Sequence, residues 1–157
     1  MKRNFFNQNF YGIREIGTYI PEKRINNTLK QEKFGFKESF LEEKIGVFET
    51  SLKDETEDCS DMCVKAFNDL VSKISIEKNE IEVIIVVTQN PDDRIPHAGA
   101  LVHKKLALPV SCASFDISLG CSGFVYGLSV ITSFMKANSM KKGILFTSDP
   151  YSKIIDP

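Results

Sequence analysis

Apolar positions in this chain alternate between two patterns, continuous β-branched runs and helical stripes. Residues 81–88 form a nearly continuous run of Ile and Val, which is typical of a strand buried on both faces of a parallel sheet. Shorter runs at 111–118 and 143–148 predict two further strands, and Tyr11–Ile20, closed by Pro21, predicts a first one. Strands that alternate with helices predict an α/β sheet with right-handed crossovers.

Three helices are predicted between these strands. The first follows Thr56, a good N-cap residue, and carries apolar residues at helical spacing. The second runs from Pro96 to about Leu106. The third follows Cys121 as far as about Asn138 and is apolar nearly all round, so we expect it to be buried, either between two sheets or between a sheet and a partner. Its expected main stripe comprises Phe124, Val125, Leu128, Ile131, Thr132 and Met135.

The region between the first strand and the first helix has a different character. Asn26–Glu43 is mixed and poor in apolar residues. It predicts short helices interrupted at Gly35, forming a surface excursion beside the core. A short extended piece is expected within Ile45–Ser51, after Gly46.

Composition indicates an ordinary soluble globular domain. The chain has 157 residues, of which 42% are hydrophobic and 26% charged, and its formal net charge is −1. Lys and Arg are scattered, so neither a nucleic-acid groove nor a membrane surface is expected, and no apolar run is long enough to span a bilayer. Met1–Phe10 lacks an apolar stretch and is expected to be a tail, not a signal peptide. The four cysteines are therefore expected to be reduced thiols in the cytoplasm.

Two pairs of potential metal ligands are better explained without a metal, the cysteines as core residues and the histidines as surface or polar-edge residues. Cys59 and Cys63 lie on the apolar stripe of their helix with no further ligand indicated, and we expect both in the core. His97 and His103 are six residues apart, so they point to different faces of their helix. No metal site is predicted.

The stretch Ser114–Phe124 carries the candidate chemistry. It predicts a short strand, a turn flanked by Gly120 and Gly123, and a helix start, which places Cys121 at a helix N-terminus. Free N–H groups and the helix dipole there favour a thiolate and can lower a cysteine pKa from about 8.5 to roughly 3.5–7.5. Cys121 is therefore predicted to be a nucleophile. The alternative is a small buried residue at a tight turn.

The segment Asp116–Phe124, with the sequence DISLGCSGF, resembles the active-site segment of beta-ketoacyl-acyl-carrier-protein synthase III. The resemblance extends from about Tyr11 to Pro157. It implies an α/β, thiolase-like fold, of which this chain is the first of two halves: a mixed, mostly parallel sheet with helices on both faces and a buried nucleophile helix. It also implies a tail at 1–10 and a half-domain at 11–157, with the C-terminal half absent from this chain.

The resemblance further implies the reaction that begins fatty acid synthesis. Cys121 takes an acyl group from acyl-coenzyme A, and the acyl-enzyme condenses with malonyl-acyl-carrier protein. The coenzyme A thioester is a substrate, and no cofactor is implied. The N–H of Cys121 supplies one donor of an oxyanion hole. The second donor, and the histidine and asparagine that stabilise the enolate, belong to the family's other half, so this chain alone is not expected to complete condensation.

Three substrate-binding residues are carried over from the same resemblance. Phe40 and Lys44 stand where many family members have Trp and Arg against the adenine end of coenzyme A, although Lys lacks the planar guanidinium. An apolar helix residue beside a solvated lysine is the alternative interpretation. Ile95 stands where the family often has Phe reaching across a dimer interface into the acyl pocket. A homodimer that pairs through the strand at 111–118 is implied.

Other functions remain compatible with the sequence. The chain could be part of another thiolase-fold enzyme, such as a hydroxymethylglutaryl-coenzyme A synthase or a polyketide-type starter enzyme. It could be a non-catalytic half that only folds and dimerises, although the presence of Cys121 argues against this. A thiol-dependent hydrolase would need a base near Cys121, and the sequence indicates none.

Overall fold

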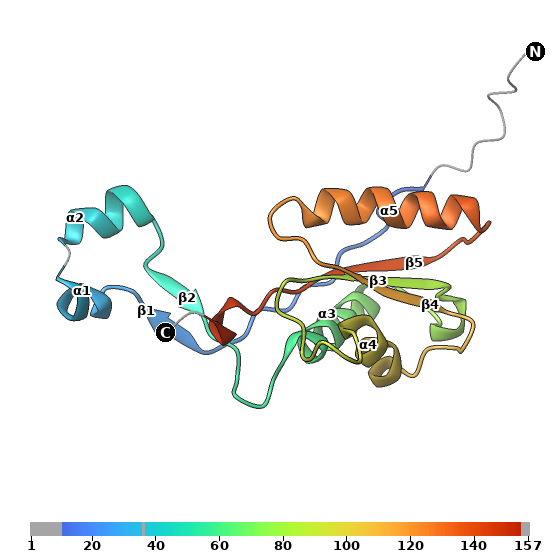
Figure 1. Ribbon diagram of the computed structural model, residues 1–157, viewed down its shortest axis with the longest axis horizontal. Coiled ribbons are helices and arrows are strands. Elements are labelled where there is room, and N and C mark those ends of the chain that lie inside the picture. Colours follow the sequence, from blue (N-terminus) through green and yellow to red (C-terminus); the bar gives the residue numbers. More distant parts are fainter. Residues whose placement is uncertain (1–10, 36, 155–157) are drawn as a thin grey trace, which may run out of the picture.

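The computed structural model describes residues 11–35 and 37–154, and the predicted tail at 1–10 lies outside them. Figure 1 shows two parts, a compact body and an arm that extends from it. The body is a parallel three-stranded sheet with helices on both faces, and the arm holds a separate antiparallel pair of strands. The predicted α/β architecture is therefore confirmed, with the antiparallel strands separate from the main sheet.

The body is organised around one central strand. The sheet has the order β4 (Ala113–Ile117), β3 (Val83–Val87) and β5 (Gly143–Thr147), and both pairings are parallel. Every residue of β3 is buried, as the Ile and Val run predicted. Val87 is paired with Ile117 on one side and with Thr147 on the other. The carboxyl ends of all three strands therefore meet at one edge of the sheet.

Two helices cover the lower face of the sheet in Figure 1. These are α3 (Cys59–Lys73) and α4 (Ala98–Leu106). Their buried side chains form one cluster with Ile84 and Val86 of the central strand. The helical members of this cluster include Cys59, Cys63, Phe67, Leu70, Val102 and Leu106.

Both helices begin later than predicted. Asp58, not Thr56, is the N-cap of α3, and it forms a capping box in which its N–H donates to Asp61 Oδ2 at 3.1 Å. Thr56 lies in the preceding turn. The N-cap of α4 is His97, so Pro96 lies outside the helix. In both cases a side chain that can accept from the first free N–H groups fixes the start.

The helix that follows Cys121 covers the opposite face of the sheet (Figure 1). This helix, α5 (Gly123–Ala137), confirms the predicted element. Phe124 and Val125, which belong to the predicted apolar stripe, are 48% and 67% exposed. The buried residues instead recur at every fourth position: Gly123, Gly127, Ile131 and Met135.

Two glycines explain this orientation. A methyl group on Gly123 would lie 2.4 Å from Val87 Cγ1, and one on Gly127 would lie 2.9 Å from atoms of both Val87 and Leu145. No larger side chain fits at these distances, so the glycine face is the one that approaches the sheet. The opposite face, which includes Tyr126, is exposed. Within the described chain the sheet therefore covers α5 on one side only, and a second layer over its exposed face stays a prediction.

The arm matches the predicted surface excursion. Its two helices are separated at Gly35, which has a φ of +68°, and an extended piece follows Gly46, as expected. Strands β1 and β2 pair antiparallel at the base of the arm. The elements of the arm are β1 (Arg24–Asn26), α1 (Leu29–Phe34), α2 (Glu38–Phe40), the π-helical turn η2 (Leu41–Ile45) and β2 (Glu49–Ser51).

The predicted first strand, Tyr11–Ile20, is wrong. This segment forms neither helix nor strand and is bonded to the side chains of α3. The N–H of Thr18 donates to Asp69 Oδ2 at 2.7 Å, and Lys73 Nζ donates to the carbonyl of Ile16 at 3.0 Å. Two of its backbone groups thus bond to the side chains of a helix, which an alternating sequence pattern cannot distinguish from pairing in a sheet.

Two short 3₁₀ turns complete the structure. One, η3 (Lys78–Glu80), precedes β3, and the other, η4 (Tyr151–Lys153), follows β5. Within residues 11–35 and 37–154, no helix is both long and apolar enough to cross a lipid bilayer.

Candidate active site

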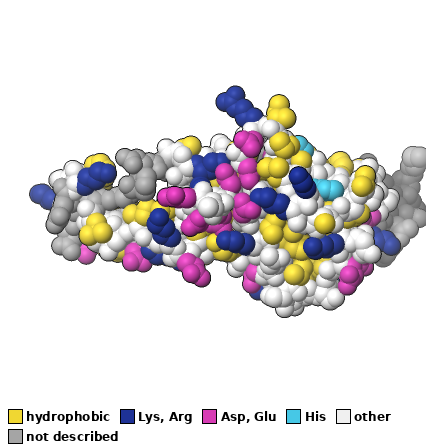
Figure 2. All heavy atoms as spheres, turned by 90° about the horizontal axis from the view of Figure 1, so that it is seen from below, with side chains coloured by type: hydrophobic (Ala, Val, Ile, Leu, Met, Phe, Trp, Pro, Cys, Tyr) yellow, Lys and Arg dark blue, Asp and Glu magenta, His cyan; other side chains and the backbone are white. Residues whose placement is uncertain are grey.

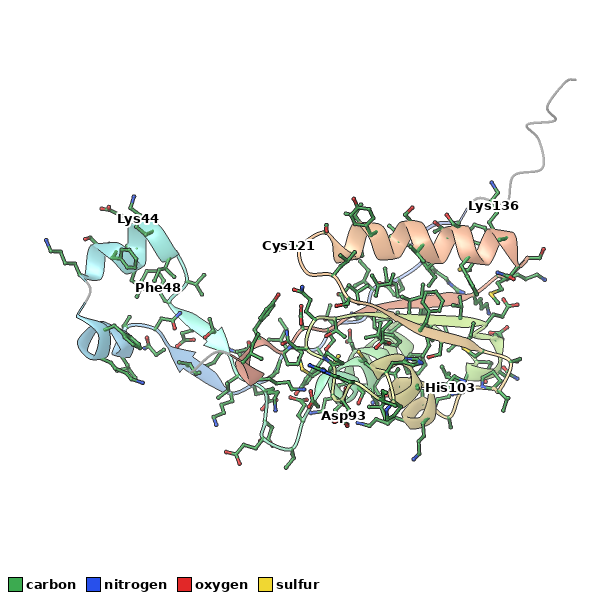
Figure 3. The ribbon with its side chains drawn as sticks, in the orientation of Figure 1. Lys44, Phe48, Asp93, His103, Cys121 and Lys136 are labelled. Atoms are coloured by element: carbon green, nitrogen blue, oxygen red, sulfur yellow. The ribbon has the colours of Figure 1, made fainter. Side chains whose placement is uncertain are left out.

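Cys121 lies on the turn between β4 and α5, at the end of α5 that faces the arm (Figure 3). The turn is closed by the N–H of Gly123, which donates to the carbonyl of Gly120 at 2.8 Å. The Cys121 side chain is exposed, whereas the other three cysteines are buried. The predicted strand–turn–helix placement is confirmed, and the alternative of a buried residue at this position is wrong.

The start of α5 has backbone N–H groups that the N-cap side chain does not cover. Ser122 is the N-cap, but its side chain makes no capping hydrogen bond. In the described part of the chain, the N–H groups of Cys121 and Ser122 donate to no acceptor. Free N–H groups at a helix start carry partial positive charge, which stabilises a thiolate or an oxyanion placed beside them. The turn can therefore both hold a nucleophile and supply an oxyanion donor.

A carboxylate joins the segments that follow β3 and β5. Asp149 Oδ1 accepts from the N–H of Gln89 at 3.2 Å and from Asn90 Nδ2 at 2.5 Å. It also accepts from the hydroxyl of Thr88 at 3.5 Å. These residues follow the carboxyl ends of two parallel strands, the edge at which open α/β sheets bind ligands. Asp149 fixes this edge next to the Cys121 turn.

Two further polar side chains lie directly against the turn. The hydroxyl of Tyr151 donates to Gln89 Oε1 at 3.1 Å, and a methyl group on Gly120 would lie 2.7 Å from the same oxygen. The negative charge of Asp149 raises the pKa of Tyr151, and partial burial and the nearby Cys121 contribute to the same shift. Tyr151 is therefore a neutral hydrogen-bond donor at physiological pH.

The two histidines are engaged elsewhere. His97 Nδ1 lies 3.2 Å from Asp116 Oδ1, and His103 Nε2 lies 3.0 Å from the carbonyl oxygen of Pro109. Neither contacts Cys121, so neither serves as a base for its thiol in this structure. In the described residues, no group of three or more His, Cys, Asp or Glu side chains is placed to hold a metal ion.

The predicted core role of Cys59 and Cys63 is confirmed. They are 0% and 2% exposed, and Cys59 Sγ lies 3.3 Å from the carbonyl oxygen of Ser148. A hydrogen bond with Cys59, together with burial, raises the pKa of Cys63. Burial likewise raises the pKa of Cys112. The raised pKa values keep the thiols of Cys63 and Cys112 protonated and unreactive.

The structure places the other predicted site residues away from Cys121. Phe40 and Lys44 lie on the arm (Figure 3 labels Lys44), whereas Ile95 lies on the loop between β3 and α4 and is 91% exposed. Phe40 and Lys44 are brought together, because both line one shallow hollow of about 370 Å³. The hollow is lined by Gly35, Lys37, Ser39, Phe40, Glu43 and Lys44.

Comparison with known proteins agrees with this geometry. The family model described as 3-oxoacyl-[acyl-carrier-protein] synthase III matches residues 115–157. The beta-ketoacyl-[acyl-carrier-protein] synthase III of Deinococcus deserti is 32% identical over 145 residues, which cover 92% of this chain and 41% of that protein. The synthase III 2 of Staphylococcus epidermidis is 31% identical over 149 residues, covering 95% and 45%.

The solved structures give the same result. The synthase III of Thermus thermophilus superimposes with a TM-score of 0.85 at 27% identity, covering 93% of this chain and 45% of the other. This chain matches the first half of beta-ketoacyl-acyl-carrier-protein synthase III. It spans less than half the length of these relatives, and the predicted family resemblance and thiolase-like fold are confirmed.

The match to synthase III separates the predicted site residues into two groups. Cys121 lies inside the family-model match, whereas Phe40, Lys44 and Ile95 lie outside it. Sequence reasoning missed the polar groups around the turn, of which Gln89, Asp149 and Tyr151 are the chief members. Their signal was positional, because each follows the carboxyl end of a predicted parallel strand.

Proposed function

We propose that Cys121 is the acyl-accepting nucleophile of a beta-ketoacyl-acyl-carrier-protein synthase III. The exposed thiol at the uncapped start of α5 is the observation that carries the proposal. Its support is the similarity to synthase III relatives, of which this chain spans less than half. The activity is therefore proposed for a protein in which these 157 residues supply the nucleophile.

The proposed reaction has two steps. First, the Cys121 thiolate attacks the carbonyl carbon of acyl-coenzyme A, a new carbon–sulfur bond forms, and coenzyme A leaves as a thiolate that takes up a proton. The N–H of Cys121 stabilises the oxyanion in this step. Second, malonyl-acyl-carrier protein loses carbon dioxide, its carbanion attacks the acyl carbon, and the Cys121 thiolate is released. No cofactor is required, since both substrates are thioesters.

The arm supplies the proposed contact with coenzyme A. Phe40, 46% exposed in its hollow, offers an aromatic face for the adenine ring. Lys44 lines the same hollow and offers a positive charge. The hollow lies on a different part of the molecule from Cys121, as an extended substrate with its nucleotide and thioester at opposite ends requires.

We also propose that two copies pair through β4. This strand is at one edge of the sheet, so its outer hydrogen-bonding groups have no neighbouring strand in the described chain. Val110, three residues before β4, is 100% exposed, and Ile95, on the loop between β3 and α4, is 91% exposed. Light scattering should give the mass of a dimer, and a monomer at high concentration would contradict the pairing.

A cytoplasmic location is proposed because the nucleophile needs a reduced thiol.

Product formation tests the proposed function. The full protein is incubated with acetyl-coenzyme A and malonyl-acyl-carrier protein, and 3-oxobutyryl product is measured. Wild type should form it, Cys121→Ala should not, and Cys112→Ala is the matched control that should. Product that survives in Cys121→Ala, or no product from the folded full protein, would overturn the proposal. A polypeptide of residues 1–157 alone is expected to give none, since the family resemblance assigns the enolate-stabilising groups to the other half.

A further inference from the structure

Two segments of the chain join the arm to the body (Figure 1). The first connection, residues 17–23, runs from the body to β1, and the second connection, residues 52–57, runs from β2 back to α3. They are bonded to each other next to the arm, where the N–H of Leu52 donates to the carbonyl oxygen of Lys23 at 2.9 Å. The direction in which the arm points therefore depends on what holds these two connections against the body.

One side chain of α3 contacts both connections. Lys65 Nζ donates to Glu57 Oε1, in the second connection, at 2.7 Å, and to the hydroxyl of Tyr19, in the first, at 3.0 Å. The same ammonium lies 4.6 Å from the centre of the Tyr19 ring, close enough for a cation–π contact. The bonds to Glu57 and Tyr19 raise the pKa of Lys65, so the ammonium stays charged at physiological pH. These three residues, Lys65, Glu57 and Tyr19, are called the clasp.

The carboxylate of the clasp is buried. Glu57 is only 5% exposed, and in the described part of the chain its second oxygen, Oε2, has no hydrogen-bond partner. A buried carboxylate is costly unless a charged or polar partner compensates it, and here the partner of the carboxylate is Lys65. Without that ammonium, Glu57 would have to take up a proton or move out to water. Moving out would release the second connection from α3.

The first connection meets α3 immediately before the clasp. A methyl group on Gly17 would lie 2.3 Å from the carbonyl oxygen of Ala66 and 2.6 Å from Leu70 Cβ, so the backbone at Gly17 lies directly against the helix. Tyr19, which is bonded to Lys65, follows two residues later. The clasp therefore lies where the chain leaves the body for the arm.

We propose that Lys65 is a positioning residue that fixes the direction of the arm relative to Cys121 by binding both connections. The inference rests on the proposed function, in which the arm contacts the nucleotide of coenzyme A while Cys121 takes the acyl group. One extended substrate reaches both places only when the arm points correctly. If an open clasp leaves the arm correctly placed for about 10–30% of the time, the apparent affinity for acyl-coenzyme A falls about three- to tenfold.

Two substrates of different length test this role in the full protein. Acetyl-coenzyme A can reach the arm, whereas the acetyl thioester of N-acetylcysteamine carries no nucleotide and cannot. Lys65→Met should lower kcat/KM for acetyl-coenzyme A about three- to tenfold, mainly through KM, and leave kcat/KM for the short thioester unchanged. A lysine that served only stability would lower both values together. Lys65→Arg, which can still pair with Glu57, should restore most of the loss.

Hydrogen exchange tests the clasp without any condensing activity. In Lys65→Met, peptides that contain residues 17–23 and 52–57 should exchange several-fold faster than in wild type, whereas β3 should keep its wild-type rate. Lys73→Met is the matched control. Lys73 is also on α3 and donates to Asp69 Oδ2 at 2.6 Å and to the carbonyl of Ile16 at 3.0 Å, so its bonds do not reach the second connection. Exchange at residues 52–57 and both kcat/KM values should not change in this control.

Smaller changes keep the inference testable if Lys65→Met does not fold. Tyr19→Phe removes only the hydroxyl, and Glu57→Gln removes only the charge. Each should give the same pattern as Lys65→Met, with a smaller loss.

The outcomes distinguish this inference from the proposed function. Unchanged exchange at residues 52–57 in folded Lys65→Met, or in both smaller variants, would overturn the clasp even if the protein condenses acyl groups. Equal losses with the two thioesters, or no loss with either, would overturn the positioning role. Faster exchange in a protein that forms no 3-oxoacyl product would support the clasp and contradict only the proposed function.

Discussion

The body and the arm use their apolar residues in opposite ways. In the body, all five residues of β3 are buried between helices on both faces. In the arm, Leu41 is fully buried, but most large apolar side chains are not. Those that are 42% to 73% exposed are Leu29, Phe34, Phe40, Ile45, Val47 and Phe48.

The two parts therefore suit different roles in the proposed reaction. The body places the Cys121 turn on a packed scaffold, where strand ends and a helix start fix its geometry. The arm instead presents apolar and basic side chains on an open surface, which suits contact with a large ligand. Figure 2 shows the body face that carries α3 and α4, where acidic side chains and lysines are intermingled.

The largest expected effect is a difference in labelling rate among the four thiols of the body. Cys121 is exposed, whereas Cys59, Cys63 and Cys112 are buried and react only when the body opens. Opened fractions of about 10⁻³ or less predict that iodoacetamide labels Cys121 on the order of 10³-fold faster. Site-resolved mass spectrometry measures the four rates. Labelling of a core cysteine at the rate of Cys121 would contradict the packed body.

Matched leucine substitutions test the same contrast as free energies of unfolding. Leu106→Ala removes a side chain that is 2% exposed and should lower the stability by about 2–5 kcal/mol. Leu29→Ala, in the arm, removes one that is 73% exposed and should change it by less than about 0.5 kcal/mol. Urea unfolding of both variants decides the point. Equal losses would show that the arm packs as tightly as the body.

The affinity for coenzyme A tests whether the arm binds the adenine ring. If Phe40 stacks on adenine, Phe40→Ala should weaken binding by roughly 1–3 kcal/mol, judged by stacking in nucleic-acid complexes, and Phe40→Trp should not. Phe48→Ala is the matched control, because Phe48 is equally exposed on the arm but does not line the hollow. Calorimetry on the full protein measures the three affinities. A loss shared by Phe40→Ala and Phe48→Ala would refute a specific stacking site.

The smallest effect concerns the start of α3. Burial raises the pKa of Asp61, but hydrogen bonds from Lys105 and from the N–H of Asp58 lower it more, so the net shift is downward. A lowered folded pKa stabilises the fold above the unfolded value of about 3.9, and that contribution is lost as the pH falls through the folded pKa. Asp61→Asn should lower the stability at pH 7 by about 1 kcal/mol or less, since the side chain is partly exposed.

The pH profile provides the control for Asp61. The difference in unfolding free energy between wild type and Asp61→Asn should shrink as the pH falls below about 4. A difference that stays constant down to pH 2 would show that Asp61 acts through packing instead of charge. Guanidinium unfolding at several pH values measures it.

The sequence was most informative where periodicity and burial coincide. The Ile and Val run of β3, the apolar stripe of α3 and the glycine-flanked Cys121 turn were all predicted correctly. Tyr11–Ile20 failed because an extended segment can bond to a helix as well as to a strand. The face of α5 that meets the sheet was not predicted, because the helix is apolar nearly all round and hydrophobicity does not single out Gly123.

The contact between Gln89 and Tyr151 could not be predicted from local patterns. Gln89 and Tyr151 are 62 residues apart and meet only because β3 and β5 are neighbours in the sheet. Similarly, Asp149 joins segments about 60 residues apart in sequence. Such contacts depend on strand order, which the alternation of strands and helices does not determine.

Direct observation of an acyl-enzyme tests the central claim. The full protein is mixed with acetyl-coenzyme A in the absence of malonyl-acyl-carrier protein, quenched in acid, and examined by intact mass and peptide mapping. The expected result is one acetyl group, located on Cys121, that is lost with neutral hydroxylamine and absent from Cys121→Ala. Acetylation of another residue, or none on Cys121 in a folded protein that binds coenzyme A, would contradict the assignment of Cys121 as the nucleophile.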